Sequence, residues 1–260
     1  TMERNKYILE HFGLEGKVAM VTGGNSGIGK TIALGLAKAG ADLFIYTHSD
    51  RGVKEMEQEV AEIGRTVKFA QGNLDEEKDA MNSVEECINA YGRIDILVNN
   101  AGTIHRAPLL EGENDSWKKV IDLNLSSIYY ISKVAAKYMK EQKSGKIINI
   151  ASMLSFQGGK FVPSYTASKH GVAGLTKAFA NEMAEMNIQT NAIAPGYIET
   201  ANTAPIRADE NRNKEILSRI PAARWGQTDD LAAAAVFLAS KASDYMNGHV
   251  MCVDGGWIVR

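Results

Sequence analysis

KVAMVTGGNSGIG, residues 17–29, decides the fold. Its first six residues form a nearly continuous apolar run, which is typical of a strand that is buried on both faces. A glycine-rich stretch then allows a tight turn, and a helical pattern follows from about Ile28 to Ala39. A buried strand, a glycine-rich turn and a helix together indicate the first unit of a parallel α/β sheet.

The same alternation continues to the end of the chain. Further short apolar runs predict strands at residues 43–46, 66–70, 94–98, 146–150, 188–194 and 249–253, with helical stretches between them. Strands that are separated by helices form a parallel sheet covered on both faces. We therefore predict an α/β fold over residues 1–260, in the form of a single doubly wound Rossmann-like domain with a seven-stranded parallel sheet.

Composition excludes several classes of function. Lys and Arg total 29 against 31 for Asp and Glu, and the net charge of −2 gives no sign of a nucleic-acid or membrane partner. Two cysteines, Cys87 and Cys252, and five scattered histidines show neither a disulfide framework nor metal-ligand spacing. No apolar run approaches the ~20 residues of a membrane span. We expect a cytoplasmic protein without a metal.

The glycines of the opening stretch point to a dinucleotide. Gly23 can take the tight turn, Gly27 lets a pyrophosphate approach the backbone, and Gly29 lets the helix and strand pack closely. Free N–H groups and the positive end of the helix dipole would attract the phosphates. A plain glycine-rich turn is the alternative, but the position directly after the first strand favours cofactor binding.

Tyr165 and Lys169 stand four residues apart, so on a helix their side chains share one face. An ammonium beside a phenol favours the phenolate and can lower the pKa of the phenol from ~10 towards neutrality. Such a phenol could exchange a proton during the interconversion of an alcohol and a ketone. Spacing alone leaves open a helix with one exposed Tyr and one exposed Lys.

The glycine spacing Gly-x-x-x-Gly-x-Gly resembles that of the short-chain dehydrogenase/reductase family. Further landmarks of that family follow in order over essentially the whole chain: Asn99-Asn100-Ala101-Gly102, Asn124, Ser152, Tyr165 with Lys169, and Pro195-Gly196. The resemblance implies an enzyme, an oxidoreductase that acts on a CH–OH group with NAD or NADP.

The resemblance also implies a role for each of four catalytic residues. Ser152 would hydrogen-bond the substrate oxygen, and Tyr165 would take or give its proton. Lys169 would lower the pKa of Tyr165 and hold the nicotinamide ribose. Asn124 would position a water that relays the proton from Lys169 outward.

For the cofactor, the resemblance implies NAD, with NADP as the alternative. Relatives that prefer NAD usually carry an acidic residue where this chain has Thr47, and His48 could supply a weak positive charge for NADP. A solvated loop explains these two residues equally well. The implied cofactor-binding residues are Gly23, Asn25, Ser26, Gly27, Ile28, Gly29, Thr47, His48, Asn73, Leu74, Asn100, Ala101, Gly102, Tyr165, Lys169, Pro195, Gly196, Ile198 and Thr200.

Several stretches resemble one branch of the family, the sugar-acid dehydrogenases that act on 2-deoxy-D-gluconate at C3 or 2-keto-3-deoxy-D-gluconate at C5. These stretches are residues 148–159, 191–197, 207–210, 219–226 and 253–257. Gluconate 5-dehydrogenases are close neighbours of this branch. The resemblance further implies a homotetramer and a substrate lid at about residues 197–221.

A sugar-acid substrate requires a cation for its carboxylate, and an arginine fork suits that task. Arg106, Arg207, Arg212 and Arg219 are candidates, although a solvent-facing charge is the alternative for each of them. The predicted substrate-binding residues are Arg106, Ser152, Met153, Gln157, Tyr165 and Arg207.

Two other functions remain open. A 3-oxoacyl-acyl-carrier-protein reductase would use the same chemistry, but its acidic carrier favours a basic docking patch, of which the net charge gives no sign. A non-catalytic dinucleotide-sensing regulator would be expected to lack Tyr165 or Lys169.

Overall fold

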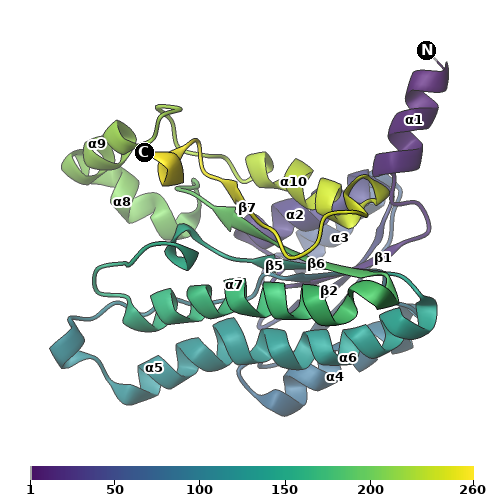
Figure 1. Cartoon of the computed structure of the whole chain (residues 1–260), viewed down its shortest axis with the longest axis horizontal. Helices are drawn as coiled ribbons and strands as arrows, with labels where there is room; N and C mark the ends of the chain where they lie inside the picture. The colour runs from purple at the N-terminus through teal and green to yellow at the C-terminus, as the bar shows by residue number, and fades with distance from the viewer. Residues whose placement is uncertain (1) are drawn as a thin grey trace.

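The computed structural model describes residues 2–260 and contains a seven-stranded parallel sheet in the order β3-β2-β1-β4-β5-β6-β7 (Figure 1). All seven predicted strands are present and pair in parallel. The strands are β1 Val18–Thr22, β2 Asp42–Thr47, β3 Val67–Gln71, β4 Ile96–Asn99, β5 Gly145–Ile150, β6 Ile188–Pro195 and β7 Val250–Val253.

The strand order places a crevice at one edge of the sheet. β1 lies between β2 and β4, so the chain builds outward on one side of β1 and then crosses to the other. The loops that follow the carboxyl ends of β1 and β4 therefore lead to helices on opposite faces of the sheet. In open parallel sheets this topological switch point is where ligands bind.

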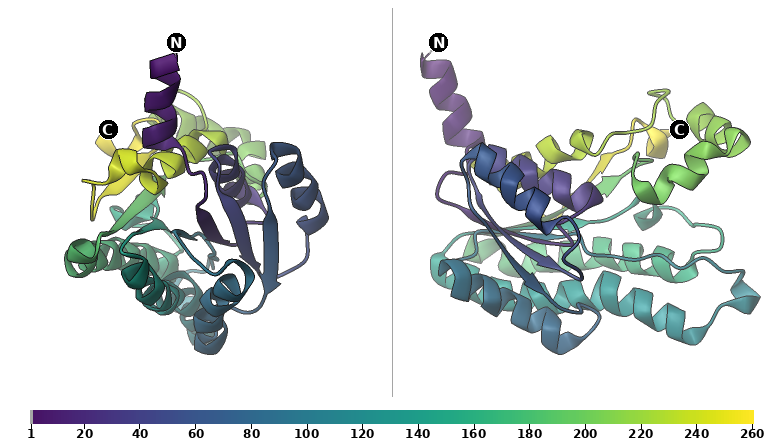
Figure 2. Two further views of the ribbon diagram at one scale, coloured as in Figure 1. Left: turned by 90° about the vertical axis from the view of Figure 1, so that its right-hand side faces the viewer. Right: turned by 180° about the vertical axis from the view of Figure 1, so that it is seen from behind.

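Helices cover both faces of the sheet (Figures 1 and 2). One face carries α2 Gly27–Lys38, α3 Val53–Ile63 and α10 Asp229–Ala239, and the other carries α4 Glu77–Tyr91, α5 Asn114–Ile121, α6 Ser127–Gln142 and α7 Pro163–Met183. The segment after β6 holds the 3₁₀ turn η5 Ala201–Thr203 and two helices, α8 Ala204–Ala208 and α9 Glu210–Arg219. Further short turns are η1 Leu109–Glu111, η3 Met153–Ser155, η4 Ala184–Met186, η6 Lys241–Ser243 and η7 Trp257–Val259, and the π-helical stretch is η2 Asp122–Ser126.

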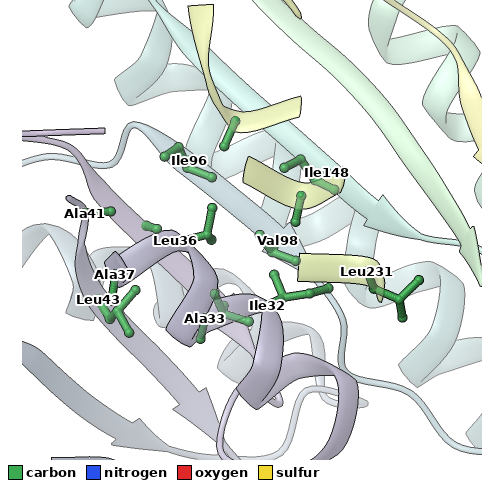
Figure 3. Packing of buried hydrophobic residues seen from close by; sticks show 14 of the residues in the cluster. Ile32, Ala33, Leu36, Ala37, Ala41, Leu43, Ile96, Val98, Ile148 and Leu231 are labelled. Atoms are coloured by element: carbon green, nitrogen blue, oxygen red, sulfur yellow. The ribbon is translucent and has the colours of Figure 1, made fainter. Parts of the chain in front are cut away.

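Each face of the sheet has its own apolar core, because successive strand residues point to opposite sides. In β1, Val21 packs under α2 and α10, whereas Met20 packs towards α4 and α6. Figure 3 shows Ile32 and Leu36 of α2 in the first core, with residues from the sheet and α10 around them. The two cores fix the strands whose carboxyl ends form the crevice.

The helix α1 Met2–Phe12 projects from the body of the molecule (Figures 1 and 2). No element was predicted for these residues. Phe12 at its end packs on Phe237 with ring centroids 6.5 Å apart. Within residues 2–260, no helix has the length and apolarity that a bilayer crossing requires.

Candidate active site

The turn that follows β5 fixes the hydroxyl of Ser152. Ser152 caps η3, and its Oγ accepts a hydrogen bond from the backbone N–H of Leu154 at 3.1 Å. The hydroxyl of Ser155 accepts from the N–H of Ser152 at 3.3 Å and donates to the carbonyl of Lys169 at 2.7 Å. This reciprocal cap holds the side chain of Ser152 and ties the turn to α7.

The helix α7 begins with Pro163 and presents Tyr165 and Lys169 one turn apart, as predicted. The Lys169 side chain is buried, with the residue only 6% exposed, and its Nζ donates to the carbonyl of Ile150 at 2.7 Å. The same Nζ lies 5.5 Å from the centroid of the Tyr165 ring. Because Ile150 is the last residue of β5, the lysine joins the helix to the strand that leads to Ser152.

The pKa values of this pair differ from the expectation based on spacing. Burial raises the pKa of Tyr165 above 10.0, while the hydrogen bond from Ser152 and the positive charge of Arg106 act in the lowering direction. Burial lowers the pKa of Lys169 from 10.5 to about 8. The expected lowering of the tyrosine pKa by Lys169 is therefore not found, since burial outweighs the favourable contacts and the ammonium hydrogen-bonds Ile150 instead of the phenol.

Asn124 lies in η2, where α5 gives way to a π-helical stretch before α6, and is 1% exposed. Its Oδ1 accepts from the N–H of Thr103 at 2.8 Å, and its Nδ2 donates to the Thr103 carbonyl at 2.8 Å. The Nδ2 also lies 3.3 Å from the Oγ of Ser168 on α7. Asn124 thus braces the loop after β4 against α7, and its role in positioning a water stays a prediction.

The glycine-rich turn has the shape that a pyrophosphate requires. Gly23 and Gly27 have φ angles of 62° and 53°, in the left-handed region that favours glycine. A Cβ on Gly27 would meet no atom within 4 Å, so the backbone there is open. A Cβ on Gly29 would come within 2.3 Å of the Asn100 Nδ2, which explains the close packing predicted for that residue.

The start of α2 can bind an anion. Ser26 caps the helix without a side-chain hydrogen bond, so the first N–H groups of α2 have no partner in that side chain. The Asn100 amide donates to the carbonyls of Thr22 and Gly23 at 3.0 and 3.2 Å and so holds the β4 loop against this turn. The open backbone at Gly27 and the helix start therefore fit the diphosphate of a dinucleotide.

Thr22 also shapes this region, a role that was not predicted. The hydroxyl of Thr22, the last residue of β1, accepts hydrogen bonds from the N–H groups of Asn100 and Ala101, both at 3.0 Å. It therefore positions the loop that leads from β4 into the crevice. The only signal in the sequence was its place directly before Gly23.

Thr47 ends β2, as predicted, and its contact with the adenosine end of a cofactor stays a prediction. It is buried, and its hydroxyl donates to the carbonyl of Ser49 at 2.6 Å and accepts from the N–H of the same residue at 3.1 Å. This hydroxyl shapes the β2–α3 turn. Asn25 supports the same turn by donating to the Arg51 carbonyl at 2.9 Å. His48 is exposed and free to contact a ligand.

The remaining residues predicted to contact the cofactor also line the carboxyl edge of the sheet. Asn73 is exposed, and Gly102 is exposed beside the Asn124 side chain. Four others are buried or half-buried in the walls of the crevice: Leu74, Pro195, Ile198 and Thr200.

The structure separates the candidate arginines. Arg106 is exposed on the loop between β4 and α5, and its charge acts on Tyr165. Arg207, in contrast, donates to the Thr200 carbonyl at 3.3 Å and lies 3.6 Å from the carboxylate of Glu199. These contacts engage the Arg207 guanidinium within the segment after β6, and its binding of substrate stays a prediction.

The other two arginines are also engaged with the protein. Arg212 pairs with Glu215 at 2.6 Å on the exposed side of α9. The guanidinium of Arg219 lies 4.0 Å from the centroid of the Trp257 ring. Of the four candidates, Arg106 is therefore the arginine whose charge reaches the reacting phenol.

Two further predicted residues, Met153 and Gln157, occupy the turn that begins at Ser152. Met153 is buried in the core cluster that contains Trp225 and Trp257, so its contact with a substrate stays a prediction. Gln157 is half-buried and accepts a hydrogen bond from the indole of Trp257 at 3.0 Å.

The chain has close relatives of known name. A family model described as enoyl-(acyl carrier protein) reductase matches residues 23–258. The chain is 53% identical over 255 residues to a 2-dehydro-3-deoxy-D-gluconate 5-dehydrogenase of Bacillus subtilis, covering 98% of this chain and 99% of the relative. It is 51% identical over 254 residues to an enzyme of the same name from Escherichia coli, covering 97% and 100%.

A solved structure has the same fold. It is a gluconate 5-dehydrogenase from Burkholderia cenocepacia in complex with NADP and tartrate, and it is 37% identical to this chain with a TM-score of 0.92. The match covers 97% of this chain and 99% of that one.

Proposed function

The chain belongs to the short-chain dehydrogenase/reductase family, and we propose that it interconverts a hydroxyl and a ketone on a sugar acid with NAD or NADP. The substrate that fits best is 2-keto-3-deoxy-D-gluconate, reacting at C5, or 2-deoxy-D-gluconate, reacting at C3. The observation that carries the reaction type is the set of Ser152, Tyr165 and Lys169 at the end of β5. The names of the relatives at 53% and 51% identity support the substrate class.

Each residue of the site has its own role in proton transfer. Ser152 hydrogen-bonds the substrate oxygen, and Tyr165 takes its proton during oxidation or returns it during reduction. The hydrogen bond from Ser152 and the charge of Arg106 favour the phenolate that oxidation requires. Bound NAD or NADP accepts or supplies the hydride. Gly27 and the start of α2 would hold its phosphates, and Lys169 its ribose.

For the cofactor we propose either NAD or NADP, and two observations bear on NADP. The turn after β2 offers no carboxylate at Thr47 to bond a ribose hydroxyl pair, and His48 beside it is exposed. NADP is the cofactor bound in the Burkholderia cenocepacia relative. These two observations support acceptance of a 2′-phosphate.

We also propose a cytoplasmic homotetramer in which residues 197–221 form a lid over the substrate. The family resemblance supports the assembly, and the helices α8 and α9, which follow the carboxyl end of β6, support the lid. Light scattering that gave the mass of a single chain, 28.3 kDa, would contradict the tetramer.

The function is tested by assaying the purified protein with 2-keto-3-deoxy-D-gluconate and D-gluconate, each with NAD and with NADP. We expect a change in nicotinamide absorbance with the first substrate and a smaller one with gluconate. An acetoacetyl thioester in the same assay tests reduction of acyl-carrier-protein substrates. No turnover with any sugar acid would overturn the proposed substrate class.

Replacing Arg106 by leucine is expected to raise the KM for the sugar acid about 10- to 100-fold, the effect of losing a charge-assisted hydrogen bond to a carboxylate. The same change removes a positive charge that lowers the pKa of Tyr165, so the rise of the oxidation rate with pH should move to higher pH. Steady-state kinetics over a range of pH measure both effects.

The control for Arg106 is Lys140→Leu, which removes an exposed positive charge near the end of α6, at the opposite end of β5 from Ser152. Its KM and pH profile should match those of the unaltered protein. Equal effects of the two substitutions would show that Arg106 acts only through the overall charge of the surface.

A further inference from the structure

Trp257 lies against the turn that carries Ser152. It begins η7 near the C-terminus and is 6% exposed. Its Nε1 donates a hydrogen bond to the Oε1 of Gln157 at 3.0 Å. Gln157 stands at the other end of the short turn from Ser152, and its backbone N–H donates to the Met153 carbonyl at 3.1 Å. The turn is compact, so Ser152 and Gln157 belong to the same wall of the crevice.

This contact decides how the Gln157 amide is oriented. An indole N–H can only donate, so the atom of Gln157 that faces it must be the acceptor oxygen. The two hydrogens on Nε2 are then directed to the other side of the amide. Among residues 2–260, the Gln157 Nε2 has no hydrogen-bond partner, and it is not among the buried polar atoms. The amide therefore offers two free donors on Nε2, while its oxygen is held at the indole and keeps one lone pair.

The indole itself is held from several sides. The guanidinium of Arg219, the last residue of α9, lies 4.0 Å from the ring centroid, and the Tyr197 ring lies 4.7 Å away. The carboxylate of Asp254 accepts from the N–H groups of Gly256 and Ile258, both at 2.9 Å. These contacts fix the backbone and the ring of Trp257, so the hydrogen bond to Gln157 has a fixed direction.

A second contact ties the same tail to α9. The guanidinium of Arg260 donates to the Ser218 carbonyl. The C-terminal turn is thereby attached both to the segment after β6 and to the turn after β5. Trp257 is placed where these two walls of the crevice meet.

We propose that Trp257 is a positioning residue that turns Gln157 into a dedicated hydrogen-bond donor for a carboxylate or keto oxygen of the substrate. This inference rests on the proposed function, because it takes a sugar acid as the ligand of the site. A donor held in a fixed orientation favours an anionic or carbonyl oxygen, which accepts one of its hydrogens, over a group that must donate. Gln157 then selects the substrate, and Trp257 acts through it.

The test is a double-mutant cycle that combines Trp257→Phe with Gln157→Leu. Phenylalanine keeps an aromatic ring under Arg219 but removes the N–H. We expect Trp257→Phe to raise the KM for the sugar acid about three- to tenfold, the effect of one neutral hydrogen bond, with kcat and the pH profile little changed. In the Gln157→Leu background the same substitution should have no further effect on KM.

Trp225→Phe is the matched control. The Trp225 Nε1 donates to the Oδ1 of Asn213 at 2.7 Å, so this substitution also removes one indole hydrogen bond next to α9. It does not touch Gln157, and its effect on KM should add to that of Gln157→Leu. If the effects of Trp257→Phe and Gln157→Leu also add, the positioning role is overturned.

A second readout does not depend on turnover. The three tryptophans give three indole N–H resonances, and the one lost in Trp257→Phe identifies Trp257. In Gln157→Leu this resonance should move to the position of an indole without a hydrogen bond, while that of Trp225 stays in place. An unmoved Trp257 resonance overturns the pairing. Absence of turnover by the unaltered protein with all sugar acids would instead overturn the proposed function.

Discussion

Replacing Tyr165 by phenylalanine is expected to lower kcat by about 10³-fold or more, within the range for loss of a general acid–base group. The substitution removes one oxygen, and the hydrogen bond from Leu154 to Ser152 and that from Lys169 to Ile150 do not involve it. The cofactor dissociation constant should therefore change little. Steady-state kinetics and a fluorescence titration with the reduced cofactor measure the two quantities.

Tyr245→Phe serves as the control for Tyr165, because its side chain is fully exposed next to η6, at the opposite end of the sheet from Ser152. It should leave kcat unchanged. If Tyr165→Phe kept a tenth or more of the activity, another group would have to carry the proton, and the assignment of Tyr165 would be wrong.

Replacing Lys169 by methionine is expected to have opposite effects on activity and stability. kcat should fall about 10²- to 10⁴-fold, because the ammonium 5.5 Å from the Tyr165 ring is lost from the proton-transfer site. The free energy of unfolding at pH 7 should rise by up to about 3 kcal/mol, less the cost of leaving the Ile150 carbonyl without its donor, since a pKa lowered from 10.5 to about 8 reflects a buried charge at ~1.36 kcal/mol per unit. Functional groups often lower the stability of a protein, and replacing them then raises its free energy of unfolding.

The pH dependence of that stability gain has a definite sign. The folded state binds the Lys169 proton more weakly than the unfolded state, so the penalty is fully present below pH 8 and is lost as pH rises towards 10.5. The difference in unfolding free energy between Lys169→Met and the unaltered protein should therefore shrink from pH 7 to pH 10. Denaturant unfolding at several pH values measures it.

Lys30→Met is a suitable control for this effect, because the pKa of Lys30 is raised: burial lowers it, but the bonds to Glu59 and Glu55 outweigh burial. Removing Lys30 takes away these favourable pairs, so no stabilisation is expected. A gain of the same size in both variants would mean that methionine stabilises either lysine position, and that the lowered pKa of Lys169 is not the cause.

The fold and the placement of Tyr165 and Lys169 on one helix could be predicted because their signals are local. Apolar runs define the strands, the glycine spacing marks the turn after β1, and a spacing of four places Tyr165 and Lys169 on one helix face. The helix α1 had no such signal, since its exposed Tyr7, Ile8 and Leu9 do not form the stripe of a packed helix.

Contacts that depend on the path of the folded chain could not be predicted. Arg207 contacts Glu199 and Thr200 because of how the chain turns after β6, which no periodicity in the sequence reveals. The raised pKa of Tyr165 depends on how completely the surrounding loops bury it. The contact between Gln157 and Trp257 joins residues 100 positions apart.

The path of α7 has a consequence for how this protein can change in length. Over its 21 residues the helix carries Tyr165 and Lys169 near its start, and Ala180 and Met183 in the cores near its end. One residue inserted between Lys169 and Ala180 would rotate the start of the helix by about 100° relative to its end. Tyr165 and the core residues near the end could then no longer keep their places together. The exposed turn around Gly158 and Lys160 has no such constraint. Insertions and deletions in homologues and in engineered variants should therefore accumulate at that turn and be rejected within the helix.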